Sequence, residues 1–138
     1  MIYLLDSNAW ISVFRGKNTA ILQHLKTHTP DEIAHCPIVI AELWYGVCRS
    51  QPSYRAANEH LVRNVQAKYL SLPFDAAVAF RSAELRAELA ATGTPIGPYD
   101  LLIAATAQVH GATLITANST EFSRVSQLLT ENWHADES

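Results

Sequence analysis

The sequence predicts a single α/β domain with a central parallel sheet of four to five strands and helices on both faces. Short all-apolar runs alternate with longer segments of helical periodicity, which is typical of a parallel sheet covered on both sides. The length of 138 residues suits one domain. No repeat or break in composition divides residues 1–138, so they are assigned to one unit.

The N-terminal part begins with a strand at residues 2–5, an all-apolar run that ends at an acidic residue. Asn8 is then the candidate N-cap of the first helix. A second helix fits residues 19–28, because its apolar positions share one face, and Pro30 stops it.

The middle of the chain repeats this order. Residues 33–36 predict a short strand, and Pro37 suits the first turn of a helix that runs to about Arg49, since a proline there loses no hydrogen bond. Apolar residues recur every four positions over residues 53–67, which predicts another helix. A short strand is expected at residues 69–72.

The last third is expected to contain two long helices and two strands. Asp75 opens a helix that Gly93 closes, and glycines and prolines mark residues 92–98 as a loop. The remaining expected elements are a helix at 99–110 ended by Gly111, a strand at 112–116, a helical turn around Glu121, an edge strand at 127–133 and an acidic tail at 131–138.

The composition excludes several classes of protein. With 49% apolar and 17% charged residues, the chain is not a disordered segment. Cys36 and Cys48 form no CxxC pair, so a structural zinc site is not expected. The N-terminus does not resemble a signal peptide and no apolar run is long enough to span a membrane, so we expect a protein of the cytoplasm.

The net charge of −3 does not by itself suggest a nucleic-acid partner. Residues 131–138, however, carry three acids and no lysine or arginine, and further acids gather around one expected pocket. A basic rim around that pocket is therefore compatible with the total charge. Its candidate members are Arg15, Lys17, Arg49, Arg55, Arg63 and Lys68, each of which is equally well explained as part of a solvated helix face.

Three acids stand where open α/β sheets bind ligands, beyond the carboxyl ends of the strands. Asp6 directly follows the first strand, Glu42 lies in the helix after the second, and Asp100 lies at the start of the helix before the 112–116 strand. Each also has a plain structural explanation, since Asp6 and Asp100 could cap helices and Glu42 could be solvated. Carboxylates that converge favour a hard cation such as Mg²⁺ or Mn²⁺, which can assist phosphoryl hydrolysis.

The chain resembles the PIN-domain ribonucleases, and most closely the VapC toxins of type II toxin–antitoxin modules. The resemblance rests on LLDSNAWI, IAELWYG, GPYDLLIAATA, LITAN and the closing EF…ENW, which span positions 2 to 133. It implies a single PIN-like domain with Mg²⁺- or Mn²⁺-dependent endoribonuclease activity that leaves a 5′-phosphate and a 3′-hydroxyl. It also implies a cognate VapB-type antitoxin, and a homodimer in a prokaryotic cytoplasm.

By the same resemblance, Asp6, Glu42 and Asp100 are the expected catalytic and metal-binding acids. The family's fourth acid often stands where this chain has Asn118, which brings no charge. Glu121 matches the acid of an N-x-x-E-F variant and could supply that charge. The other supporting positions are Ser7, Asn8 and Thr116.

Alternatives remain open on the sequence. A PIN-like domain that has lost catalysis would only bind a partner. A phosphatase of the haloacid-dehalogenase type needs a second Asp at position 8, which is Asn, and a receiver-type protein needs a lysine after the strand that ends at Thr116. Trp10, Trp44 and Tyr45 lie beside the acids in sequence, where core or dimer packing is favoured over base stacking.

Overall fold

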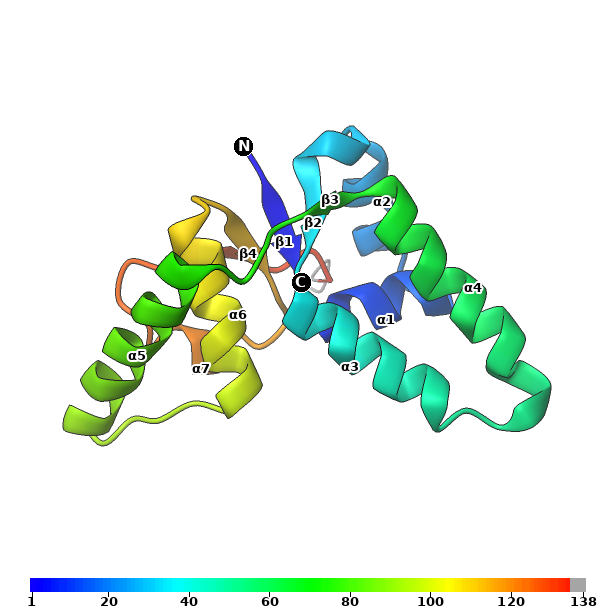
Figure 1. Ribbon diagram of the computed structural model, residues 1–138. Coiled ribbons are helices and arrows are strands. Elements are labelled where there is room, and N and C mark those ends of the chain that lie inside the picture. Colours follow the sequence, from blue (N-terminus) through cyan, green and yellow to red (C-terminus); the bar gives the residue numbers. More distant parts are fainter. Residues whose placement is uncertain (135–138) are drawn as a thin grey trace.

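The computed structural model describes residues 1–134 and confirms the α/β class (Figure 1). Five parallel strands form one sheet in the order β3-β2-β1-β4-β5, so β1 lies at its centre. The strands are β1 (Tyr3–Leu5), β2 (Ile33–His35), β3 (Leu70–Ser71), β4 (Thr113–Ile115) and β5 (Thr130–Glu131). The helices are α1 (Ser7–Arg15), α2 (Thr19–Lys26), α3 (Pro37–Cys48), α4 (Pro52–Lys68), α5 (Ala76–Ala91), α6 (Pro98–Val109) and α7 (Ser119–Phe122), with a 3₁₀ turn at Pro30–Glu32.

The centre of the sheet is apolar and fully buried. Leu4 and Leu5 of β1 have no exposed surface, and neither have Leu114 and Ile115 of β4. The connections leave β1 toward β2 on one side and return to β4 on the other. The carboxyl ends of β1 and β4 therefore form the topological switch point, where α/β sheets bind ligands.

The helices form two antiparallel pairs that diverge from the sheet (Figure 1). One pair is α3 with α4 and the other is α5 with α6, while α3 and α6 contact each other near the strands. All four begin and end within three residues of the positions expected from sequence. Among the described helices, none is both long enough and apolar enough to cross a membrane.

The cap of the first helix lies two residues before the expected one. Asp6, not Asn8, is the N-cap of α1, because its Oδ1 accepts a hydrogen bond of 2.8 Å from the Ala9 amide. Asn8 lies inside the first turn and is exposed. In α2 the cap is Asn18, whose Oδ1 accepts from the Ile21 amide, and the helix ends at Lys26 instead of residue 28.

The C-terminal strand is shorter than expected. Gln127 has a positive φ of 66°, so the backbone turns there, and β5 covers only Thr130 and Glu131 instead of 127–133. Residues 131–134 of the expected acidic tail are part of the fold, because Trp133 is buried to 1% exposure. The rest of that tail, residues 135–138, lies outside the described residues.

Trp133 joins the sheet to α2. Its ring stacks nearly parallel to His24 and His28, with centroid distances of 4.9 and 5.3 Å, and lies 5.1 Å from Tyr3 of β1. Its indole N–H donates to Glu131 at 2.9 Å. His24 is exposed and His28 is half-buried, so both histidines stay at the surface while they pack against this ring.

Candidate active site

The first acid is held at the switch point of the sheet. Asp6 follows β1, its amide donates to the Ile115 carbonyl of β4, and its side chain is only 7% exposed. Burial raises the pKa of this carboxyl, while hydrogen bonds from the Thr116 hydroxyl and the Ala9 amide partly offset the effect. Asp6 therefore caps α1 and also lies at the switch point, so both interpretations of this residue apply.

The second acid is tied to the first helix. Glu42 lies in the second turn of α3, and the Ser7 hydroxyl of α1 donates to its Oε1. This hydrogen bond joins the residue after Asp6 to the helix that follows β2. Ser7 therefore supports the site as the sequence suggested, whereas no hydrogen bond joins the side chain of Asn8 to any described residue.

The third acid is electrostatically coupled to the others. Asp100 lies in the first turn of α6, and its pKa is raised to about 6, chiefly by burial. The negative charges of Glu121, Glu42 and Asp6 add to this increase, in that order. Like charges raise a carboxyl pKa only at short range, so the other three acids must lie near Asp100.

Glu121 is fixed by two hydrogen bonds at the edge of this cluster. Its Oε1 accepts from the Gly97 amide at 2.9 Å and its Oε2 from the Asn118 side chain at 2.8 Å. These donors lower the pKa of Glu121, so it stays charged. Thr116 in turn accepts from the Asn118 amide at 2.9 Å. Asn118 has no charge, but it orients Glu121, which does.

Gly97 is a part of this site that the sequence did not identify. A Cβ at this position would lie 3.6 Å from Asp100 Oδ2 and 3.8 Å from Glu121 Oε1, so the two carboxylates flank its backbone. The only sequence signal was its place in the Gly- and Pro-rich loop. Such a loop indicates a turn, but not that the Gly97 amide donates to Glu121. We name the group of Asp6, Glu42, Asp100 and Glu121 the acid cluster.

The donor chemistry of the acid cluster fits a hard cation, because every candidate ligand atom is oxygen. Within residues 1–134, however, no three His, Cys, Asp or Glu side chains are close enough to hold one ion together. Glu42 and Glu121 already accept hydrogen bonds from the protein. The arrangement therefore suits an ion such as Mg²⁺, which needs only one or two carboxylates and keeps several waters.

A groove of about 310 Å³ begins at Glu42 and runs between α1, α3 and α4. Its walls are mostly apolar, and Arg15 and Asn58 are its other polar side chains. The apolar lining residues are Ile11, Phe14, Leu43, Gly46, Val47, Leu61 and Val62.

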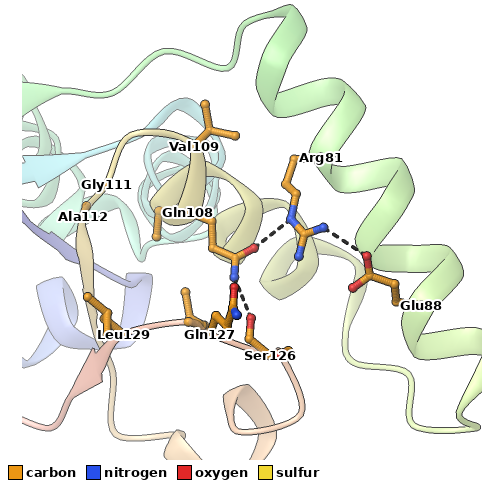
Figure 2. Close-up of a pocket in the computed structure, with 11 residues that line it drawn as sticks. Arg81, Glu88, Gln108, Val109, Gly111, Ala112, Ser126, Gln127 and Leu129 are labelled. Carbon is orange, nitrogen blue, oxygen red and sulfur yellow. Dashed lines mark hydrogen bonds and ion pairs between the residues drawn. The ribbon is translucent and has the colours of Figure 1, made fainter.

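A larger cavity, of about 580 Å³, lies at the other end of the sheet and contains none of the acid cluster (Figure 2). Its polar side chains bind one another: Arg81 donates to Gln108 and Glu88, and Gln108 donates to the Ser126 carbonyl. Because these donors are satisfied within the protein, we interpret the network as a structural link between α5, α6 and the segment before β5.

Only some of the candidate rim residues lie on the Glu42 side of the molecule. Arg15 borders the groove beside Glu42, and Arg49 lies 5.3 Å from the ring centroid of Tyr45, one turn further along α3. Arg63 is paired with Glu59 at 3.0 Å and also covers Trp44. The other three, Lys17, Arg55 and Lys68, have no described contact with the acid cluster.

The aromatic residues near the acids have different roles. Trp10 is fully buried and packs on Tyr69, with ring centroids 5.0 Å apart, which confirms core packing. Trp44 is half-buried under Arg63. Tyr45 alone is exposed, at 67%.

Comparison with known proteins agrees with this architecture. A PIN domain matches residues 3–128. The chain is 32% identical to the tRNA(fMet)-specific endonuclease VapC of Shigella flexneri (95% of this chain, 97% of the relative). It is 36% identical to Ribonuclease VapC2 of Rickettsia felis (96% and 98%).

Solved structures show the same fold. VapBC from Salmonella typhimurium, in a DNA-bound crystal structure, has a TM-score of 0.89 and 31% identity (96% of this chain, 98% of that chain). VapBC2 from Rickettsia felis, bound to a promoter DNA fragment, has a TM-score of 0.85 and 36% identity (96% and 99%). With matches over nearly its whole length in sequence and in structure, the chain belongs to the PIN-domain family and, within it, to the VapC group.

Proposed function

We propose that this protein is a Mg²⁺- or Mn²⁺-dependent endoribonuclease toxin that hydrolyses RNA phosphodiester bonds in a prokaryotic cytoplasm. The observation that carries this proposal is the electrostatic coupling of four acids near the switch point of the sheet, where burial and the charges of Glu121, Glu42 and Asp6 raise the pKa of Asp100 to about 6. The names of its relatives, which are ribonucleases, support the same reaction.

Asp6 and Asp100 are the proposed inner ligands, because Asp6 lies at the switch point and the Asp100 carboxylate accepts no hydrogen bond within residues 1–134. Glu42 and Glu121 are oriented by Ser7 and Gly97. A bound Mg²⁺ or Mn²⁺ supplies an activated water and stabilises the charge that develops on the phosphoryl group. Ser7 and Thr116 keep the carboxylates of Glu42 and Asp6 oriented, and Asn118 keeps Glu121 in place. Water is added across the P–O3′ bond, leaving a 3′-hydroxyl and a 5′-phosphate.

The proposal is tested by incubating the purified protein with cellular RNA and Mn²⁺ or Mg²⁺ and sequencing the new 5′ ends. We expect discrete cleavage sites that disappear with a chelator. Metal binding without cleavage would instead support a domain that has lost catalysis. The receiver-type alternative is not supported, because those proteins have the strand order 2-1-3-4-5 and this sheet has the order 3-2-1-4-5.

A cognate antitoxin is the proposed protein partner. The groove is mostly apolar and Glu42 is its one acidic lining residue, so it suits a segment with apolar side chains and one arginine that pairs with Glu42. An arginine can pair with two carboxylate oxygens and stays charged at all physiological pH values. We expect expression without the antitoxin to arrest growth; free growth with a fully active enzyme would contradict the toxin assignment.

A homodimer is proposed from exposed apolar side chains. Trp10 does not contribute, because it is buried, but Phe80 of α5 and Tyr99 of α6 are 67% and 59% exposed. A second copy that covered them would remove apolar surface from water. Sedimentation at micromolar concentration is expected to give twice the monomer mass of 15.2 kDa, and a stable monomer would contradict this.

The stability of the metal-free protein is expected to fall as the pH rises from about 4 to about 6, and to change little from this group above that range. The pKa of Asp100 is about 6 in the folded chain against an ordinary value of 3.8, so the folded state keeps a proton that the unfolded chain has lost. Deprotonation through this window therefore costs folding free energy.

Melting temperatures across this pH range check the prediction, with Asp100→Asn as the control. The variant retains the other titrating groups, including the buried His35. Burial lowers the pKa of His35, so its titration makes the stability rise with pH, opposite to the effect of Asp100. We expect a smaller decrease in the variant, and Mn²⁺ should raise the melting temperature of the parent near pH 7. Equal slopes for parent and variant would show that Asp100 is not protonated in this window.

A further inference from the structure

Two residues of α3 and the C-cap residue that follows it form a stripe that leads away from the acid cluster. Glu42, Tyr45 and Arg49 are spaced i, i+3 and i+7, so they lie on one face of the helix. At a rise of 1.5 Å per residue, Tyr45 lies about 4.5 Å and Arg49 about 10 Å from Glu42 along the axis. The stripe is thus continuous with the proposed active site.

Tyr45 and Arg49 form an exposed aromatic–cation pair. The guanidinium carbon of Arg49 lies 5.3 Å from the ring centroid of Tyr45, a distance typical of a cation–π contact. Tyr45 is 67% exposed, so much of the ring is open to solvent. The guanidinium of Arg49 has no hydrogen bond or ion pair with any residue in 1–134, which leaves its donors free for an external anion.

The neighbouring arginines differ in this respect. Arg63 is paired with Glu59 at 3.0 Å, and Arg55 donates to the Cys48 carbonyl at 3.4 Å. An acid cluster repels phosphates, so an RNA strand needs a nearby positive group with unused donors. On the hairpin formed by α3 and α4, Arg49 meets that need on the same helix face as Glu42.

We propose that Tyr45 and Arg49 bind single-stranded RNA next to the bond that is cleaved, with a base stacked on Tyr45 and a phosphate paired with Arg49. This inference rests on the proposed ribonuclease function. Base stacking on an aromatic side chain tolerates any sequence, and a guanidinium matches two phosphate oxygens. The pair would therefore contribute to the affinity for the strand more than to the choice of cleavage site.

The test is the steady-state cleavage of an RNA that the parent protein cleaves. Tyr45→Ala is expected to raise KM about 10-fold with little change in kcat, and Tyr45→Phe, which keeps the ring, should stay within about twofold. Arg49→Gln should also raise KM and should reduce the dependence of log(kcat/KM) on log salt by about one unit. Arg86→Gln is the matched control, because Arg86 is an exposed arginine of α5 that is not among the candidate rim residues, and it should change neither value.

The possible outcomes separate this inference from the proposed function. If the parent cleaves RNA but Tyr45→Ala leaves KM within twofold, the inference is wrong and the function stands. If Tyr45→Ala converts a parent dimer to monomers in sedimentation, Tyr45 is a contact between copies and the inference is also wrong. A parent that neither cleaves nor binds RNA overturns both.

Discussion

Replacing Asp100 by Asn is expected to reduce RNA cleavage by on the order of 10²-fold or more while leaving the fold intact. The change keeps the size of the side chain but removes one of the two proposed inner metal ligands, and hard cations bind less tightly when a ligand loses its charge. Because burial and three neighbouring charges raise the pKa of Asp100, the metal-free variant should also be at least as stable as the parent.

The matched comparison is Asn118→Ala, which removes a neutral group of the same site. Its loss frees one oxygen of Glu121, but the Gly97 amide still holds the other, so the decrease in rate should be much smaller. Asn118→Asp would add a carboxylate beside Glu121, and we expect tighter Mn²⁺ binding at the cost of metal-free stability. An Asp100→Asn protein that cleaves at the parental rate would show that Asp100 is only a helix residue.

Replacing Trp133 by Ala is expected to lower the free energy of unfolding by about 3–5 kcal/mol, the usual cost of removing a buried indole. The ring is 1% exposed and contacts Tyr3, His24 and His28, so its loss opens a cavity between β1 and α2. Urea unfolding followed by circular dichroism measures the change.

Two further variants locate the source of this effect. Trp133→Phe keeps an aromatic ring and should cost less than the alanine change, while His24→Ala removes only an exposed stacking partner and should cost less again. A Trp133→Ala protein with parental stability would mean that residues 131–134 behave as the tail that the sequence suggested.

The individual strands and helices depend on patterns that act locally, which is why the sequence could predict most elements. Apolar runs such as residues 2–5 can be buried only in a covered sheet, and Pro37 and Gly111 mark helix ends through their own backbone preferences. Asp6 and Asp100 could be placed near each other because parallel strands direct their carboxyl ends to one edge of the sheet.

What the sequence could not predict depends on contacts between distant segments. Asn8 and Asp6 are both good caps, and only the turn after β1 decides that the Asp6 carboxylate faces the Ala9 amide. The position of Glu121 depends on the Gly97 amide, 24 residues away, and the burial of Trp133 depends on α2. No periodicity encodes such pairings, so composition suggested an acidic tail where the fold has a strand and a buried indole.

The edge position of β5 has a consequence for how the protein matures during translation. Strands leave the ribosome in chain order, and β4 is completed before β5, whose Glu131 carbonyl accepts from the Thr116 amide at 3.0 Å. The Thr116 side chain in turn favours the charged form of Asp6 and so lowers the pKa of this member of the acid cluster. A nascent chain therefore lacks this support of its cleavage centre until residue 131 has emerged, and the expected nuclease becomes competent only after β5 has paired with β4.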